Sequence, residues 1–209
     1  MHGVDQSIKT PNGEYFFTPV ELFYGRKKMV HKVAQENLIA THGLLSQSDV
    51  RWGIIFGTLL GAVRESDFIE GDEDTDIFVL AEDKGIFLAL IPGFRKLGFE
   101  IARYDGPLLS VIRDDEYIDI YFFQRKLVGR RAGDLFVPKM FFSRFDHIDL
   151  FGISFPTVSR PTQFLKYTYG KSWEIPQTGV HAAGKPAFWK KIRSFLSPVW
   201  HRSRNFFSS

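Results

Sequence analysis

An acidic run placed directly against an apolar strand constrains this chain more than any other feature. Five of the seven residues from Glu70 to Asp76 are acidic, and the chain continues as Ile-Phe-Val-Leu. Carboxylates at the edge of a core cost free energy unless a partner compensates their charge. If residues 74–80 form a strand, Asp74 and Asp76 project from the same face and repel each other. This pattern predicts a site for Mg²⁺ or Mn²⁺.

A third carboxylate lies farther along the chain. Asp119 is the lone acid in the strand-like segment Tyr-Ile-Asp-Ile-Tyr-Phe-Phe, residues 117–123. A single acid inside an apolar strand is expensive unless it has a partner. The position is explained if this strand lies beside residues 74–80, because Asp119 then completes the metal site. The alternative is that Asp119 is a strand-edge residue paired with an arginine.

The turn that precedes the acidic run suits a phosphate. Gly57 and Thr58 follow the apolar segment 50–56 and would present backbone N–H groups and a hydroxyl near the carboxylates. Arg64, at the end of a short helical segment, can neutralise phosphate charge. Together with the three aspartates, these residues indicate metal-assisted phosphoryl or nucleotidyl transfer.

Composition and element order favour one α/β (α+β) domain with a mixed sheet flanked by helices. The chain has 209 residues, 44% of them hydrophobic, and no cysteine, so no disulfide framework or thiolate metal site is expected. The sequence lacks the regular alternation of strand and helix that a doubly wound fold requires. The expected helices are 19–47 (with Thr18 as N-cap), 83–97 (broken near Pro92-Gly93) and 161–170; the expected strands are 50–56, 74–80, 99–105, 108–114, 117–123 and a hairpin over 147–158.

The segment GTLLGAVRESDFIEGDEDTDIFV, from residue 57, resembles the signature of the LicD/fukutin family. YIDIYFF is similar to the family's third-carboxylate strand, and RPTQFLKYTYGKSWEIP, residues 160–176, is similar to its late segment. The resemblance covers roughly residues 20–176. Gly71, Glu73 and Thr75 depart from the family pattern and leave the donor open, and Asp72 offers an alternative metal-binding register.

The resemblance implies a nucleotidyltransferase (polymerase-β-like) fold and a transferase that uses a CDP-activated donor. Phosphocholine or a polyol phosphate, such as ribitol or glycerol phosphate, would pass to a hydroxyl of a cell-surface glycan with release of CMP. Capsule, lipopolysaccharide and teichoic-acid pathways are all compatible. In this interpretation Asp74, Asp76 and Asp119 are catalytic and hold the metal.

The late segment adds three candidates for the donor's nucleotide or phosphate, Lys166, Tyr169 and Lys171. The alternative for them is a surface helix with solvated lysines and a tyrosine in the core. Two other functions also stay open. One is attack on the α-phosphate of a nucleoside triphosphate to modify a small molecule, and the other is a catalytically inactive glycan-binding subunit.

The basic charge of the chain is concentrated at its C-terminal end. Residues 181–209 carry six Lys or Arg and no acid, which leaves 21 basic against 24 acidic residues in 1–180. We therefore divide the chain into a catalytic domain, 1–180, and a basic aromatic tail, 181–209, and expect no nucleic-acid partner.

Within the tail, residues 185–207 mix basic and large aromatic side chains. They suit an amphipathic helix on an anionic membrane, or a helix packed on the domain. The expected location is cytoplasmic, peripheral at the inner face of the plasma membrane, where a lipid-linked acceptor would be reached.

Overall fold

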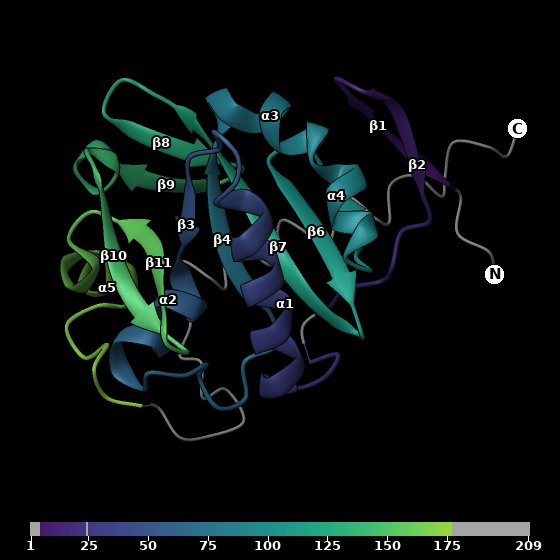
Figure 1. Cartoon of the computed structure of the whole chain (residues 1–209). Helices are drawn as coiled ribbons and strands as arrows, with labels where there is room; N and C mark the ends of the chain where they lie inside the picture. Colours follow the sequence, from purple (N-terminus) through teal and green to yellow (C-terminus); the bar gives the residue numbers. More distant parts are fainter. Residues whose placement is uncertain (1–4, 24, 177–209) are drawn as a thin grey trace, which may run out of the picture.

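The fold is a nine-stranded mixed sheet with helices on both faces and a separate N-terminal hairpin (Figure 1). The computed structural model describes residues 5–23 and 25–176. Seven strands follow the order β10-β11-β3-β4-β7-β6-β5, and β8 and β9 extend from the end of β7. The pairs β11–β3 and β4–β7 are parallel and the others antiparallel, which confirms the predicted mixed sheet.

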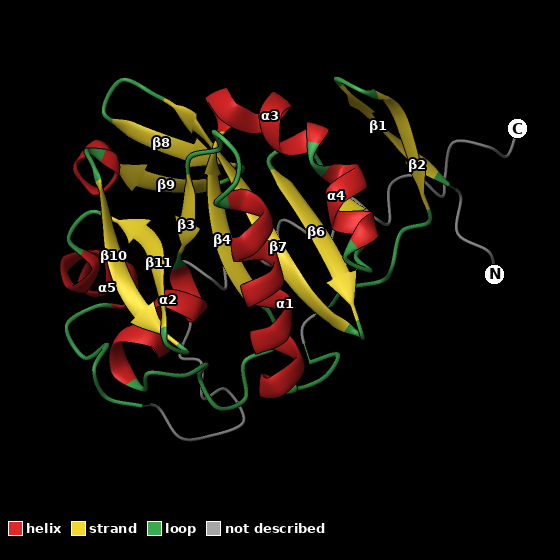
Figure 2. Ribbon diagram, in the orientation of Figure 1, coloured by secondary structure: helices red, strands yellow, loops and turns green. Residues whose placement is uncertain are grey.

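The distribution of helices, strands and loops is shown in Figure 2. The strands are β1 Gln6–Thr10, β2 Gly13–Phe17, β3 Trp52–Ile54, β4 Thr75–Leu80, β5 Glu100–Tyr104, β6 Leu108–Arg113, β7 Glu116–Arg125, β8 Gly129–Ala132, β9 Leu135–Pro138, β10 Phe145–Leu150 and β11 Ile153–Val158. The α-helices are α1 His31–Leu45, α2 Phe56–Arg64, α3 Lys84–Ala89, α4 Ile91–Lys96 and α5 Pro161–Tyr169, and two short 3-10 turns are Ala81–Asp83 and Lys139–Phe142.

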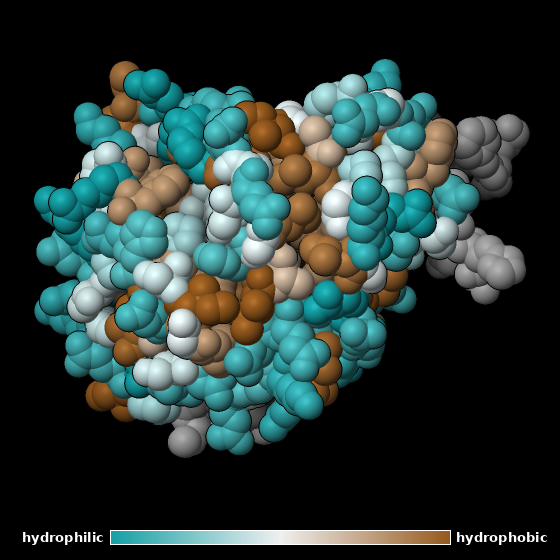
Figure 3. All heavy atoms as spheres, in the orientation of Figure 1, coloured by the Kyte–Doolittle hydropathy of each residue, from teal (hydrophilic) through white to brown (hydrophobic). Residues whose placement is uncertain are grey.

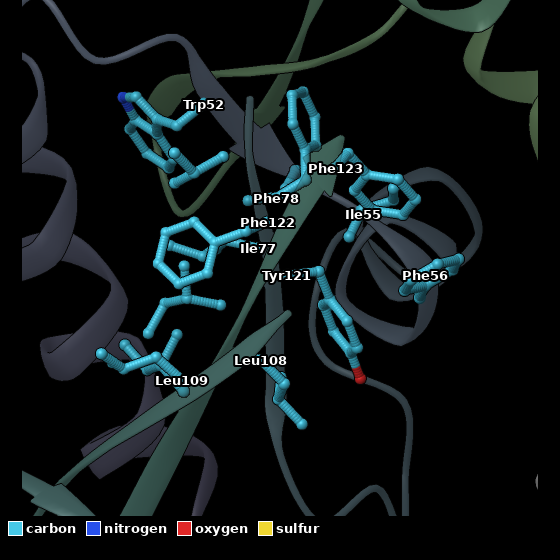
Figure 4. Close-up of a cluster of buried hydrophobic side chains, with 14 of the residues drawn as sticks. Trp52, Ile55, Phe56, Ile77, Phe78, Leu108, Leu109, Tyr121, Phe122 and Phe123 are labelled. Carbon is cyan, nitrogen blue, oxygen red and sulfur yellow. The ribbon is translucent and has the colours of Figure 1, made fainter. Parts of the chain in front are cut away.

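The central strands are apolar on both faces because helices cover both. Figure 4 shows Leu109 on the side of α1, whereas Tyr121 lies on the opposite side with Phe56 of α2. The rings of Phe56 and Tyr121 meet edge to face with centroids 5.3 Å apart, and Phe164 of α5 packs against Phe56 at 5.9 Å. The site described below lies on this second face of the sheet.

Phenylalanine supplies much of the core. The largest fully buried side chains include nine phenylalanines: Phe56, Phe68, Phe78, Phe87, Phe94, Phe99, Phe123, Phe155 and Phe164. Buried aromatic rings contribute large apolar areas and pack at specific edge-to-face angles. The many phenylalanines of the sequence are therefore explained in large part by this thick core.

The predicted helix over 19–47 is wrong in its first half. Helix α1 begins at His31, and Thr18 donates its hydroxyl to Asp5 instead of capping a helix. The preceding segment is irregular and joins the sheet, where the backbone N–H of Val20 binds the carbonyl of Ala102. Long-range contact with β5 thus overrides the local helical spacing.

The other predicted elements are present with shifted ends. The segment 83–97 is divided into α3 and α4, with Pro92 in the first turn of α4, where its missing N–H costs nothing. The β8–β9 hairpin was not predicted. The tail and its predicted membrane helix lie outside the described residues, and within those residues no helix is long and apolar enough to cross a bilayer.

Candidate active site

The backbone at the start of α2 surrounds Asp76, the second residue of β4. The N–H of Gly57 donates to the Asp76 carboxylate at 2.9 Å, and the N–H of Asp76 donates to the Thr58 hydroxyl at 2.8 Å. The N–H of Ile55 binds the Asp76 carbonyl at 3.1 Å. Gly57 therefore orients the Asp76 carboxylate, and Thr58 holds the Asp76 backbone. The direct phosphate contact predicted for both residues stays a prediction.

Gly57 also leaves room for a second carboxylate. A Cβ atom on Gly57 would lie 2.6 Å from an oxygen of Asp72 and 3.1 Å from an oxygen of Asp76. The preceding residue, Phe56, has a φ of 48°, a left-handed conformation that is rare for a bulky side chain. Such strain is commonly found at functional sites. Here it accompanies the turn that brings the Gly57 N–H to Asp76.

Four polar residues form one row across the sheet. Asp76 on β4 is directly opposite Asp119 on the parallel strand β7, Ser110 on β6 is opposite Asp119, and Arg103 on β5 is opposite Ser110. Adjacent strands in a sheet lie about 4.8 Å apart, so the four side chains are neighbours on one face. The predicted proximity of Asp76 and Asp119 is confirmed.

A bulge in β5 places Arg103 in this row. The register shifts between Ile101, which is opposite Val111, and Arg103, which is opposite Ser110. In a regular strand Ile101 and Arg103 would share a face. The extra residue, Ala102, turns Arg103 to the face of Asp119, as bulges do when they redirect a side chain.

Arg103 and Ser110 hold the Asp119 carboxylate. One guanidinium nitrogen of Arg103 lies 3.0 Å from each carboxylate oxygen, and the Ser110 hydroxyl donates to Asp119 at 2.5 Å. The Asp119 side chain is only 6% exposed and that of Arg103 is 27% exposed. Burial raises the pKa of the Asp119 carboxyl, whereas Arg103 and the Ser110 hydroxyl oppose that rise.

Asp74 is buried and is the least constrained of these carboxylates. No hydrogen bond to its side chain is found among residues 5–23 and 25–176. Its negative charge acts on the hydroxyl groups of the two tyrosines of β7 that lie on the same face as Asp119. Burial raises the pKa of the Tyr117 and Tyr121 hydroxyls, and Asp74 raises both further.

Tyr169, at the end of α5, lies beside the acidic run. Burial raises the pKa of its hydroxyl well above the usual value; Asp76, Asp72 and Asp74 raise it further, and Arg64 opposes them. Arg64 ends α2 and forms an ion pair with Glu65. Tyr169 is thus within the electrostatic influence of both the carboxylates and Arg64. The predicted contacts of Tyr169 and Arg64 with the donor stay predictions.

Lys166 and Lys171 do not join that group in the described structure. Both residues are exposed, and their side chains make no ion pair with another described residue. Their predicted role at the donor phosphate stays a prediction.

The carboxylates fit a hard divalent cation in chemistry, because Mg²⁺ and Mn²⁺ prefer oxygen ligands. Within the described residues, however, no three His, Asp or Glu side chains are already arranged as a metal site. Asp119 is bound by Arg103 and Asp76 by the Gly57 amide. Asp74 and the neighbouring Asp72 carboxylate are the remaining members of the acidic group.

The residues that sequence reasoning missed are Arg103, Ser110, Tyr117 and Tyr121. An arginine inside the predicted strand 99–105 was a signal, but regular alternation alone would place it on the face of Ile101, and the bulge is not visible in the sequence. The two tyrosines flank Asp119 at i−2 and i+2, and that spacing places them on its face.

One solved structure supports the fold. The solution structure of the antibiotic-resistance factor ANT(2'')-Ia matches with a TM-score of 0.51 and 12% identity, over 83% of this chain and 98% of that one. The lincomycin-bound lincosamide antibiotic adenylyltransferase LnuA matches with a TM-score of 0.46 and 14% identity, over 63% and 84%. At these identities the first likeness is one of fold alone.

Two sequence relatives match part of the chain. An uncharacterized protein of Rickettsia typhi is 36% identical over 86 residues, 41% of this chain and 27% of the relative. An uncharacterized protein of Rickettsia prowazekii is 39% identical over 62 residues, 30% of this chain and 23% of the relative. The matched region thus spans about a quarter of each relative.

A family model described as the LicD/FKTN/FKRP nucleotidyltransferase domain matches residues 49–181, which include the row of polar residues, the Gly57 turn and α5. This match and the mixed sheet confirm the nucleotidyltransferase fold and support a transferase. The chain belongs to the LicD/FKTN/FKRP family.

Proposed function

We propose that this chain transfers phosphocholine or a polyol phosphate from a CDP-activated donor to a hydroxyl of a cell-surface glycan and releases CMP. The observation that carries the proposal is that Asp76 and Asp119 lie directly opposite each other on adjacent strands. The start of α2 contacts Asp76, and Arg103 on the same face contacts Asp119. Buried carboxylates beside cationic groups suit a substrate that brings phosphate and a divalent cation together.

Mg²⁺ or Mn²⁺ would be held by Asp74 and Asp76, with Asp119 as the third ligand and Asp72 as the alternative. A bound divalent cation supplies positive charge to the donor's diphosphate. Asp74 suits this role because its buried carboxylate has no hydrogen bond within the described structure. Asp76 is oriented in advance by the Gly57 N–H.

Other residues of the site accept the proton, stabilise charge and bind the donor. Asp119, kept in place by Arg103 and Ser110, is the group that accepts the proton of the acceptor hydroxyl. Arg64 and Arg103 stabilise negative charge on the transferred phosphate. Tyr169, whose hydroxyl stays protonated, donates a hydrogen bond to the donor.

The test measures CMP released from CDP-choline, CDP-ribitol and CDP-glycerol, each with Mg²⁺ and extracted glycan. One donor should give CMP that depends on both the metal and the acceptor. Asp76→Asn and Asp119→Asn should lower the rate at least a hundredfold, by analogy with losing a group that acts in proton transfer or charge stabilisation. Asp49→Asn, at an exposed position in the turn between α1 and β3, is the matched control.

A nucleoside triphosphate arm separates this proposal from nucleotidyl transfer. Pyrophosphate release with the nucleotide retained on a small acceptor would replace the proposed reaction by attack at the α-phosphate. Absence of turnover with every donor, with glycan still bound, would favour the inactive binding subunit.

A further inference from the structure

The turn between β7 and β8 exposes two aliphatic side chains. Leu127 is 94% exposed and Val128 is 63% exposed. The two residues form the tip of a tight turn that the Lys126 N–H closes on the Gly129 carbonyl at 2.8 Å. In Figure 1 this turn is the loop at the upper left, joined to β8, and it projects from the domain.

Four exposed basic residues flank this tip: Arg125, Lys126, Arg131 and Lys139. None of them forms an ion pair with another residue that the structure describes. The neighbouring Arg130 differs, because it binds Glu82 and packs on Phe142. Across residues 124–144 the sequence has a single acid, Asp134, although residues 1–180 as a whole carry more acidic than basic side chains. The basic charge is therefore concentrated at the hairpin.

The tip is held firmly by the strands behind it. The Lys139 N–H binds the Val128 carbonyl at 3.1 Å. Gly129 packs so closely on β9 that a Cβ atom there would lie 2.4 Å from the Val137 carbonyl oxygen. The sequence thus maintains an apolar tip in a fixed position where solvent alone would favour polar residues. Figure 3 shows hydrophobic atoms among hydrophilic ones at this corner of the molecule.

We propose that the β7–β8 hairpin docks this protein on an anionic lipid bilayer. Leu127 and Val128 enter the boundary between head groups and acyl chains, and the four basic residues contact lipid phosphates. A convex aliphatic tip with cationic flanks matches a bilayer surface, which is apolar beneath a layer of negative charge. Nucleic acid would make no use of the aliphatic tip, because its recognition relies on phosphate contacts and stacking.

This surface is compatible with the position of the candidate active site. Asp119 and Arg125 lie on the same strand, and the six residue steps from one to the other span roughly 20 Å. The site would remain in water at that height above the lipid. A lipid-linked glycan could extend to it, but the docking inference itself does not depend on the proposed transfer reaction.

The experiment measures partitioning of the full chain onto vesicles of phosphatidylcholine, with and without phosphatidylglycerol, over a lipid titration. Binding should require phosphatidylglycerol. Leu127→Ser should lower the partition coefficient roughly tenfold, from the lost burial of one aliphatic side chain. The double variant Arg125→Gln/Lys126→Gln should lower it roughly twentyfold, from two lost attractions to the anionic surface.

Ile86→Ser is the matched control, because Ile86 is another exposed aliphatic residue on the short helix α3, and its partitioning should equal that of the wild type. Unchanged binding of both hairpin variants would overturn the proposal and leave any membrane contact to other parts of the chain. Loss with the charge variant alone would overturn lipid insertion and indicate a polyanion site. Sedimentation that detects a Leu127-dependent dimer without vesicle binding would assign the tip to a second copy of the chain.

Discussion

Replacing Arg103 with methionine tests whether this guanidinium keeps a charged Asp119 inside the sheet. Arg103 makes contacts of 3.0 Å with both carboxylate oxygens of Asp119, whose side chain is 6% exposed. Breaking a fully buried pair costs about 3–5 kcal/mol, because the remaining charge has no partner. The Arg103 side chain is 27% exposed, so solvent partly screens the pair. We therefore expect the free energy of unfolding to fall by about 3 kcal/mol, the lower end of that range.

Urea unfolding at neutral pH, followed by tryptophan fluorescence, measures this loss. For a domain of this size, 3 kcal/mol corresponds to a fall in Tm of about 6–12 °C. Arg95→Met is the matched control, because Arg95 pairs with Glu100 and both side chains are 56% exposed. Exposed pairs contribute about 0–1 kcal/mol. The reasoning is refuted if Arg103→Met destabilises the protein no more than Arg95→Met does.

Two further measurements separate charge from packing. Asp119→Asn added to Arg103→Met should recover part of the lost stability, because the unpaired charge is removed and the Ser110 contact can persist. Mn²⁺ should then raise the Tm of Arg103→Met more than that of the wild type, since the cation replaces the lost positive charge. No Mn²⁺ effect on either protein would contradict the proposed metal site and leave the Arg103–Asp119 pairing intact.

Three other predictions follow from close contacts and charge. Gly61→Ala places a Cβ 2.4 Å from a backbone carbonyl oxygen, so urea unfolding should show a loss of about 1–3 kcal/mol, and an unchanged midpoint would contradict this packing. Gly57→Ala meets the side-chain oxygen of Asp72, which can move, so the free energy of unfolding should fall by less than about 1 kcal/mol while CMP release falls at least tenfold. Arg51 lowers the pKa of the Asp83 carboxyl, so the stability that this carboxylate adds is present above its unfolded pKa of about 3.9 and is lost as pH falls through the folded value. The destabilisation by Asp83→Asn should therefore be full at pH 7 and shrink at about pH 3, and a pH-independent difference in urea unfolding would refute the linkage.

The local sequence was sufficient wherever a pattern and its partners lie close together along the chain. The alternation of residues 74–80 predicted β4, and the turn residues around Gly152 predicted the β10–β11 hairpin. Asp119 is a lone acid in an apolar strand, and a buried carboxylate costs free energy unless a cation or another partner is close by. This reasoning predicted that Asp119 lies beside β4.

Tertiary structure decided what depends on pairing between distant segments. The first half of the predicted helix over 19–47 is irregular because Val20 binds the carbonyl of Ala102 on β5. The site face of Arg103 depends on a one-residue bulge, and a shift of one residue moves a side chain to the other face of a sheet. Sequence therefore determined the carboxylates, the Gly-Thr turn and the class of fold. The counter-charge that holds Asp119 was set by strand register, which the spacing of residues along one strand does not encode.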